Sequence, residues 1–322
     1  QLKSHGDIVR TFPAVQLIRE HLGNEVIIDF ICNLGYKEVL KLCRCIDNII
    51  EIPNIDILKD NEDGARICDI SVIREKIGDI RNIVYDYYFD FHGVFSSGLI
   101  GQLANIPVRI GRHHNSTKDG ADLFYNHIFL PSVIIPNKME RNLRMVEYFF
   151  NIQYIHREAS YTHKYISVIP GSSKIGTKKR WNVKNYSDLI SRLSINNNVM
   201  VLIGPEENEL IDELRNCVNE SVKIIEVNCW EEYVSIFEES KLVIGNDTAA
   251  LHISSWMSVP SITVFGPTDY IQSESWCYVK GGGIPPVKKC TCKSAWNGEC
   301  SDSLCINSIS VDSVINKIYE TL

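Results

Sequence analysis

Apolar segments of strand length alternate with amphipathic segments of helix length along this chain, most clearly in its second half. Strands separated by helices pair in parallel, because each crossover returns the chain to the same edge of the sheet. A parallel sheet needs helices on both faces, so the pattern predicts an α/β, doubly wound architecture. The predicted strands are 165–169, 199–203, 222–227, 243–244 and 261–265, and the predicted helices are 183–193, 207–218, 230–239 and 249–257.

The first half repeats this alternation, with predicted helices at 7–22 and 137–150 and a predicted strand at 82–91. The polar segment 151–164 is the best candidate for a linker. With 322 residues, 44% of them apolar, the chain is long enough for two cores. We therefore expect two Rossmann-like domains, residues 1–155 and residues 156–322, with ligands bound in a cleft between them at the carboxyl ends of the strands. The chain opens at Gln1 in what reads as a loop, and we expect a first strand to be missing before it.

Composition excludes some classes of partner. The net charge is −7 and the sequence pI is about 5.8, which argues against nucleic acid bound through a basic face. No apolar run approaches the roughly 20 residues that span a bilayer, and no signal peptide is visible. We expect a cytoplasmic protein and leave open peripheral contact with the inner face of the cytoplasmic membrane. The oligomeric state is left open as well.

Three predicted strand-to-helix or loop-to-helix junctions carry chemistry-bearing side chains. In Ser4-His5-Gly6-Asp7, the aspartate is a candidate functional group, and the alternative is an N-cap. In the segment 170–181, small hydroxyl residues precede Lys178-Lys179-Arg180, which suits an anion pocket or a solvated loop. In the segment 246–252, Asp247 and Thr248 open a helix and could leave its amides for an anion. His252 follows one turn later, where a core histidine is the alternative.

The chain contains no Asp-x-Asp triplet, the usual carboxylate pair that holds a nucleotide diphosphate through a divalent cation. A diphosphate bound here would therefore be met by backbone N–H groups, hydroxyls and basic side chains. The junctions at 170–181 and 246–252 supply such groups.

Four blocks of the chain, in order, carry a family resemblance. The segments 4–14 and 86–111 resemble the amino-terminal signatures of the ADP-heptose:lipopolysaccharide heptosyltransferases, glycosyltransferase family 9. In the second of these, His92 stands where the family usually has Gln. The segment 172–181 is similar to the family's Lys-Arg/His-Trp-Pro element, with Asn182 replacing the proline. The segment 246–252 is similar to its Asn-Asp-Thr-Gly-x-x-His block, with Ala249 replacing the glycine. The resemblance covers essentially the whole chain.

The resemblance implies a GT-B fold and an inverting, metal-independent glycosyltransferase that moves heptose from ADP-heptose to a lipopolysaccharide core or related bacterial glycan. Asp7 would be the general base. The implied donor-binding residues are Ser172, Ser173, Lys179, Glu206 or its neighbour Glu207, Asp247, Thr248, Ala249 and His252. Arg10 and His92 are candidate acceptor-binding residues, and the segment 112–118 is either part of that site or a solvated loop, which we favour.

No cofactor is expected for catalysis. Cys290, Cys292, Cys300 and Cys305 could hold a structural zinc or iron ion, although Cys-x-Cys is tighter than the usual Cys-x2-Cys knuckle. Free or paired thiols are the alternative. For the whole chain, the competing functions are a GT-B transferase that uses another nucleotide sugar and a catalytically inactive nucleotide-binding homologue.

Overall fold

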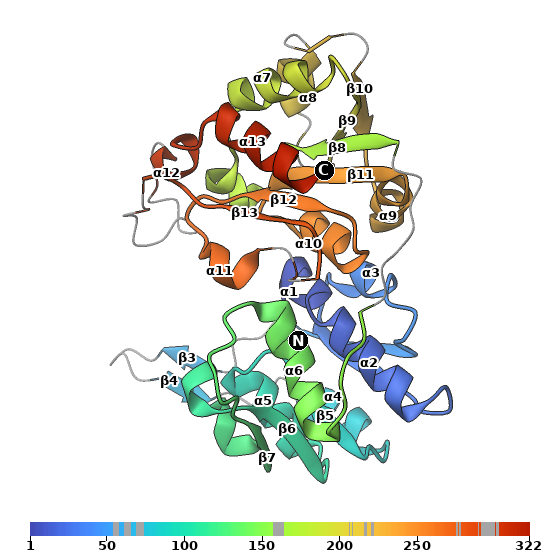
Figure 1. Cartoon of the computed structure of the whole chain (residues 1–322). Helices are drawn as coiled ribbons and strands as arrows, with labels where there is room; N and C mark the ends of the chain where they lie inside the picture. The colour runs from blue at the N-terminus through green and yellow to red at the C-terminus, as the bar shows by residue number, and fades with distance from the viewer. Residues whose placement is uncertain are drawn as a thin grey trace. The chain divides into compact units, whose positions relative to one another are not determined.

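The computed structural model describes residues 1–53, 58–60, 66–68, 74–156, 164–205, 207, 209–215, 218–219, 222–274, 276, 278–288, 290, 300 and 303–322. The chain divides into two compact units (Figure 1). Unit 1 comprises Gln1–Ile135 and Met139–Ile155, and unit 2 comprises Pro136–Lys138 and His156–Leu322. Parallel sheets in both units confirm the expected α/β class.

Unit 2 is built on a parallel sheet whose strand order is β10-β9-β8-β11-β12-β13. The chain runs outward from β8 to β10, returns to β11 beside β8, and continues outward on the other side. This is the doubly wound order. The strands are β8 (Tyr165–Ile169), β9 (Asn198–Ile203), β10 (Lys223–Glu226), β11 (Ser240–Asn246), β12 (Ser261–Val264) and β13 (Gly281–Ile284).

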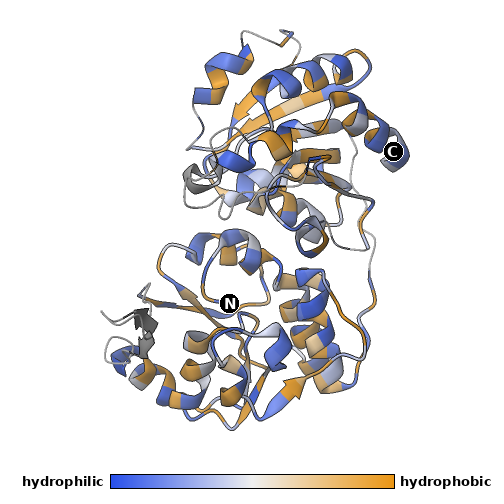
Figure 2. Ribbon diagram, turned by 90° about the vertical axis from the view of Figure 1, so that its left-hand side faces the viewer, coloured by the Kyte–Doolittle hydropathy of each residue, from blue (hydrophilic) through white to orange (hydrophobic). Residues whose placement is uncertain are grey.

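Helices cover both faces of this sheet, so its strands are mainly hydrophobic (Figure 2). On one face of the sheet, α13 packs on β12, β13 and α7, and α7 also packs on α8. On the other face, α9 and α10 pack on β11. The core between α7 and the sheet includes Ile166, Val168, Leu189 and Ile244, all fully buried. The helices are α7 (Val183–Leu193), α8 (Glu209–Arg215), α9 (Trp230–Glu238), α10 (Ala249–Trp256), α11 (Tyr270–Ser273), α12 (Leu304–Asn307) and α13 (Val311–Thr321), with a 3-10 turn η3 (Lys174–Lys179) after β8.

The described strands of unit 1 form two parallel sheets, β1-β2 and β5-β6-β7, and one antiparallel hairpin, β3-β4. The strands are β1 (Asp29–Asn33), β2 (Asn48–Ile52), β3 (Leu58–Asp60), β4 (Arg66–Cys68), β5 (Tyr87–Phe89), β6 (Val108–Arg112) and β7 (His127–Phe129). The helices are α1 (His5–Val9), α2 (Phe12–Leu22), α3 (Lys37–Leu40), α4 (Arg74–Arg81), α5 (Phe95–Leu103) and α6 (Lys138–Phe150), with 3-10 turns η1 (His114–Ser116) and η2 (Ala121–Phe124).

The predicted single helix at 7–22 is wrong, because the chain forms two helices that break at Arg10 and Thr11. Pro13 lies in the first turn of α2, where backbone N–H groups have no acceptor within the helix. Its lack of an N–H therefore costs α2 no hydrogen bond. A continuous helix would have needed that N–H. The break leaves α1 as a short separate helix that carries Asp7.

The predicted strand at 82–91 is also shorter than expected. The N–H of Asn82 binds the carbonyl groups of Gly78 and Asp79, so the chain is still turning out of α4 at this point. The extended part is confined to β5, although the N–H of Asp90 still donates to the carbonyl of Ile110 on β6.

Candidate active site

The carboxyl ends of β8 and β11 lie side by side in unit 2. Val168 pairs with Ile244 and Ile169 pairs with Gly245, so the loop that starts at Pro170 lies next to the turn at Asp247. This is the point where the strand order reverses, which is where open α/β sheets bind their ligands. Two of the three junctions singled out in the sequence are therefore brought together by the sheet.

Asn246 joins these loops through its buried side-chain amide. Its Oδ1 accepts hydrogen bonds from the N–H of Trp181 at 3.0 Å and from the hydroxyl of Tyr186 at 2.9 Å. Its Nδ2 donates to the carbonyl groups of Pro170 at 2.7 Å and Gly171 at 3.0 Å. One side chain thus holds the loop after β8, the end of β11 and the start of α7 in a fixed arrangement. The position of Asn246 at the end of a predicted strand gave no sign of this role.

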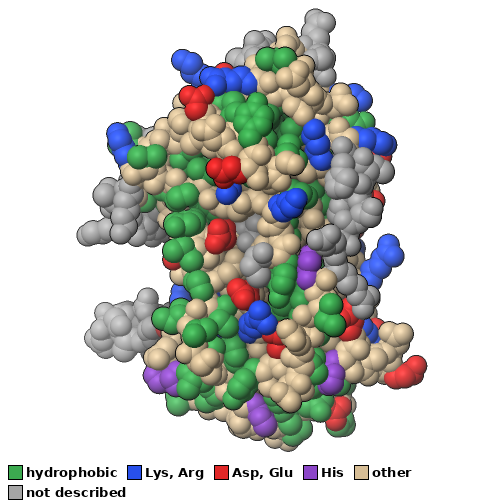
Figure 3. Space-filling view, viewed as in Figure 1, with side chains coloured by type: hydrophobic (Ala, Val, Ile, Leu, Met, Phe, Trp, Pro, Cys, Tyr) green, Lys and Arg blue, Asp and Glu red, His purple; other side chains and the backbone are tan. Residues whose placement is uncertain are grey.

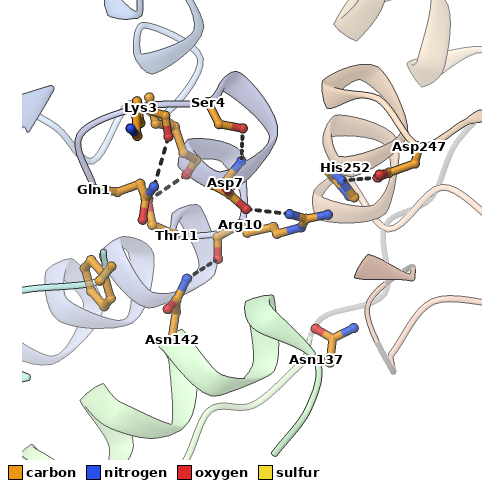
Figure 4. Close-up of polar contacts among 12 residues, drawn as sticks. Gln1, Lys3, Ser4, Asp7, Arg10, Thr11, Asn137, Asn142, Asp247 and His252 are labelled. Atoms are coloured by element: carbon orange, nitrogen blue, oxygen red, sulfur yellow. Dashed lines mark hydrogen bonds and ion pairs between the residues drawn. The ribbon is translucent and has the colours of Figure 1, made fainter. Parts of the chain in front are cut away.

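Lys179, Asp247 and His252 form a buried charged group on these loops. The Nζ atom of Lys179 lies 2.7 Å from Asp247 Oδ2, and Nε2 of His252 lies 3.4 Å from Asp247 Oδ1. Figure 4 shows His252 pointing at the Asp247 carboxylate from α10. The three side chains are 11%, 6% and 4% exposed. His252 is therefore a buried residue that contacts a charged partner, and it does not pack in a purely apolar core.

The first turn of α10 has no side-chain cap. Thr248 occupies the N-cap position with an extended backbone and makes no capping hydrogen bond, and Ala249 begins the helix. The Oγ1 atom of Thr248 is buried and has no hydrogen-bond partner among the described groups. The amides of this turn therefore lack the side-chain oxygen that usually satisfies them, as expected of an anion site.

The two serines after β8 differ in their surroundings. Ser172 is buried, and its Oγ donates to the carbonyl of Gly176 at 2.8 Å while accepting from Nε of Arg180 at 3.1 Å. Arg180 also contacts Glu209, at 2.6 Å. Ser173 is exposed. Ser172 therefore maintains the loop's shape, whereas Ser173 is accessible to solvent.

Glu206 lies outside the described residues, but its neighbour Glu207 is buried against the same loops. Oε2 of Glu207 accepts from the N–H of Gly204 at 2.9 Å. A Cβ atom on Gly171 would overlap that oxygen, so only glycine allows the carboxylate to approach the backbone here.

In unit 1, Asp7 is the third residue of α1 and pairs with Arg10. Nη1 of Arg10 lies 2.6 Å from Asp7 Oδ1, and the carbonyl of Arg10 accepts from Nδ2 of Asn142 on α6 at 3.2 Å (Figure 4). The alternative that Asp7 caps the helix is wrong. Ser4 is the N-cap, and its Oγ accepts from the Asp7 N–H at 3.4 Å. The Asp7 carboxylate is 30% exposed and is not used to cap α1.

A buried aspartate, Asp90, organises the loop that carries His92. Asp90 accepts from the N–H groups of His92 and Gly93 and from the hydroxyls of Ser97 and Tyr125. Burial is the largest cause of a lowered pKa at His92, about 4. His92 is therefore neutral at pH 7 and can offer hydrogen bonds but no charge.

The expectation that the segment 112–118 is a solvated loop is wrong for its first residue. Arg112 is 6% exposed and donates to the carbonyl groups of Phe91 and His92. Burial lowers its pKa, and its Nε has no partner among the described groups. His114 and Lys118, by contrast, are exposed. The end of β6 positions Arg112 inside the unit, which the charge pattern alone could not show.

Arg141 is a residue that sequence reasoning missed. Its pKa is lowered to about 10, first by burial and then by the charges of Arg112 and Arg10, while Asp7 opposes them. Its Nε is buried without a partner among the described groups. Three arginines thus lie within electrostatic range of Asp7. Arg141 lies on α6, far from the others along the chain, so no local spacing could have linked it to them.

Of the cysteine cluster, Cys292 lies outside the described residues. Cys290, Cys300 and Cys305 are reduced thiols, and burial followed by the nearby Cys290 thiol raises the pKa of Cys305 to about 11. No group of three His, Cys, Asp or Glu side chains in the described part of the chain could hold a metal ion. The described residues therefore give no support to a metal centre.

In the view of Figure 3, the acidic and basic side chains of the described residues are interspersed. Within the described residues, no helix is both long and apolar enough to cross a bilayer.

Comparisons with known proteins identify relatives of this chain. The model of glycosyltransferase family 9 (heptosyltransferase) matches residues 74–278. Lipooligosaccharide heptosyltransferase 2 of Campylobacter jejuni subsp. jejuni serotype O:6 is 24% identical over 277 residues, 84% of this chain and 81% of that protein. The protein of the same name from Haemophilus influenzae is 28% identical over 109 residues, 32% of this chain and 31% of that protein.

Two solved structures share the fold. The E. coli heptosyltransferase WaaC with ADP-2-deoxy-2-fluoro heptose has a TM-score of 0.72 at 17% identity and covers 100% of this chain and 98% of its own. The E. coli ADP-heptose lps heptosyltransferase II has a TM-score of 0.67 at 15% identity, with 99% and 96% covered. These likenesses confirm the predicted GT-B fold.

Proposed function

Because this chain belongs to glycosyltransferase family 9, the heptosyltransferase family, we propose that it transfers heptose from ADP-heptose to a lipopolysaccharide core or related bacterial glycan, with inversion and without a metal. The donor half of the proposal rests on the arrangement at the carboxyl ends of β8 and β11 in unit 2. There Lys179, Asp247 and the uncapped first turn of α10 lie at the switch point of the sheet.

Each donor group has a matching element at this edge. The diphosphate is held by Lys179, by the Ser173 hydroxyl and by the backbone amides of Thr248 and Ala249. Asp247 accepts hydrogen bonds from sugar hydroxyls, and His252 holds that carboxylate in place. An acidic residue, Glu206 or Glu207, binds the ribose or adenine. The ADP-heptose analogue bound to the similar E. coli enzyme supports this choice of donor.

The chemistry follows from these charges. Attack on an anomeric carbon passes through an oxocarbenium-like state in which the bond to the leaving diphosphate breaks. Lys179 and the α10 amides stabilise the negative charge that develops on ADP. The oxygen of the acceptor hydroxyl bonds to the anomeric carbon on the face opposite the leaving diphosphate. Asp7 takes the proton from that hydroxyl as the bond forms. The product is the inverted glycoside, with ADP released.

The acceptor half rests on unit 1. Arg10, Arg112 and Arg141 place positive charge within electrostatic range of Asp7, which suits an acceptor that carries phosphate or carboxylate groups. His92, neutral at pH 7, contributes a hydrogen bond. We therefore propose residues 1–155 as the acceptor-binding domain and residues 156–322 as the nucleotide-sugar domain.

Replacing Asp7 tests the proposal. We expect Asp7→Asn, which keeps the side chain's size, to lower kcat by roughly 10²–10⁴-fold, the usual contribution of a general base. ADP binding, measured by calorimetric titration, should be unchanged because the donor groups lie in unit 2. Asp79→Asn is the matched control, since the exposed side chain of Asp79 pairs with Lys76 in the same unit. Retention of more than about a tenth of wild-type turnover in Asp7→Asn would exclude Asp7 as the base.

A further inference from the structure

The proposed general base, Asp7, is paired with an arginine one helical turn away. Nη1 of Arg10 donates to Oδ1 of Asp7 at 2.6 Å (Figure 4). The spacing of three residues lets the two side chains meet on one face of the chain at α1. On the sequence alone, Arg10 is a candidate acceptor-binding residue, and the contact with Asp7 suggests a different role.

The two partners differ in their exposure to solvent. The side chain of Asp7 is 30% exposed, whereas that of Arg10 is 7% exposed. An acceptor hydroxyl can therefore reach the carboxylate but has little access to the guanidinium. A buried guanidinium is costly to leave without its carboxylate, so the pair does not open readily when an acceptor binds.

The backbone of Arg10 is held from two sides. Its N–H donates to the carbonyl of Gly6 at 3.1 Å, and its carbonyl accepts from Nδ2 of Asn142 on α6 at 3.2 Å. Asn142 is 4% exposed. The neighbours of Arg10 along the chain, Val9 and Thr11, are fully buried. The guanidinium therefore extends from a fixed backbone, which limits the positions in which it can hold the carboxylate.

The contact suits a general base in two respects. A carboxylate accepts a proton only in its ionised form, and an adjacent guanidinium favours that form. The hydrogen bond also restricts the orientation of the Asp7 side chain. This restriction matters because a base must lie within hydrogen-bond reach of the proton that it takes, and small misplacements slow the reaction strongly.

The other two arginines near Asp7 are placed differently. Nη2 of Arg112 donates to two backbone carbonyl groups. The Nε atoms of Arg112 and Arg141 are buried without a partner among the described groups. These two side chains can still donate to an acceptor, whereas the guanidinium of Arg10 is held against the base.

We propose that Arg10 is a positioning residue, which orients the Asp7 carboxylate for proton transfer and does not itself bind the acceptor. The inference rests on the proposed function, because it takes Asp7 as the base. The charge of Arg10 still adds to the positive field around the acceptor site. The anionic groups of the acceptor are contacted by Arg112 and Arg141.

Steady-state kinetics separate the two roles. The donor is ADP-heptose, and the acceptors are lipopolysaccharide cores that carry no heptose or one heptose. We expect Arg10→Gln to lower kcat by roughly 10–100-fold and to change the KM of the acceptor by less than about threefold. Arg141→Gln should instead raise that KM more than it lowers kcat. A KM for the acceptor that rises more than kcat falls in Arg10→Gln would overturn the proposal.

Two further variants control for general effects on the fold. Arg144→Gln is the matched control, because Arg144 also pairs with a carboxylate three residues away, that of Glu147, at 2.7 Å in unit 1. It should keep kcat, and an equal loss in Arg144→Gln and Arg10→Gln would contradict a specific role. Arg10→Lys keeps a charged donor and should retain more of kcat than Arg10→Gln. Equal losses in these two would also contradict the proposal, and circular dichroism checks that all variants are folded.

Crystal structures test the contact without an assay of transfer. We expect Nη1 of Arg10 within about 3 Å of Asp7 Oδ1 in the wild-type chain, and a displaced Asp7 carboxylate in Arg10→Gln. An unmoved carboxylate in Arg10→Gln would refute the positioning role. Absence of transfer by the wild-type chain to either core would refute the proposed function, and the structures would still decide whether Arg10 positions Asp7.

Discussion

At the scale of single residues, the proposed nucleotide-sugar site depends on the side-chain amide of Asn246. Asn246 faces two carbonyl groups on one side and an N–H and an O–H on the other. Only a side chain with both a donor and an acceptor satisfies all four. Aspartate would place an oxygen against the two carbonyl groups, and leucine would leave all four polar groups buried without a partner. The requirement explains why an asparagine ends β11.

His92 makes the stability of unit 1 sensitive to acid. Its pKa is lowered to about 4 in the folded chain from an ordinary value of 6.5, so the unfolded chain binds the proton first as pH falls. The stabilisation is fully present above pH 6.5 and is lost as the pH falls toward 4. Between pH 7 and pH 5, we expect the free energy of unfolding of the wild-type protein to fall by as much as about 2 kcal/mol more than that of His92→Gln.

Urea unfolding of both proteins at the two pH values measures this difference. The comparison removes the effect of the carboxylates, which titrate in both proteins. An equal loss of stability in wild type and His92→Gln would show that His92 is not the residue responsible.

At the scale of elements, α5 packs through its glycines. A Cβ atom on Gly98 would lie 2.8 Å from Cδ2 of Phe124, and one on Gly101 would lie 2.5 Å from Cδ1 of Tyr88. Tyr88 cannot easily move, because its hydroxyl donates to the carbonyl of Ser97 at 2.7 Å. The two glycines lower the helix propensity of α5, but they allow it to pack closely against β5 and η2.

Alanine substitutions should separate packing from propensity. We expect Gly98→Ala and Gly101→Ala each to destabilise the protein by about 1–3 kcal/mol, because the added methyl groups have no room. Gly78→Ala is the control, since a methyl group added there, on α4, would have no atom within 4 Å. It should stabilise by about 0.5–1 kcal/mol through helix propensity alone. Urea unfolding midpoints measure all three, and wild-type stability in the two α5 variants would refute the packing argument.

At the scale of the whole molecule, each unit has its own core, and the proposed donor site uses unit 2 alone. Donor recognition therefore predicts a ligand effect on stability that depends on the nucleotide. We expect ADP at about 100 times its Kd to stabilise the protein by about 2.7 kcal/mol, roughly 5–10 °C in Tm. UDP and GDP should have little effect, and Lys179→Ala should remove the effect of ADP.

Thermal unfolding with each nucleotide measures this and also distinguishes the competing functions. Equal protection by UDP would indicate a transferase for another nucleotide sugar. Protection by ADP combined with no transfer to any glycan acceptor would indicate an inactive homologue. If no nucleotide raised the Tm, the proposal of a donor site in unit 2 would be refuted.

Much of the fold was predictable because its signals are local. The apolar runs of β8, β9, β11 and β12 and the amphipathic helices between them follow from side-chain periodicity over a few residues. The family-model match to residues 74–278 confirms the family resemblance found in the sequence. The predictions that were wrong concern places where local signals compete, as at Pro13, where a helical pattern meets a residue that cannot donate a hydrogen bond.

By itself, the sequence determined the α/β alternation, the polar residues at the ends of β8 and β11, and the family. Only the tertiary structure decided which distant residues meet. Lys179 reaches Asp247 across 68 positions, and Asn142 reaches Arg10 across 132. The physical reason is that periodicity reports a residue's own segment, whereas these contacts depend on strand order and helix packing, which bring segments together only after the sheets have formed. The burial of Arg112 and the partial burial of Arg141 likewise follow from that packing.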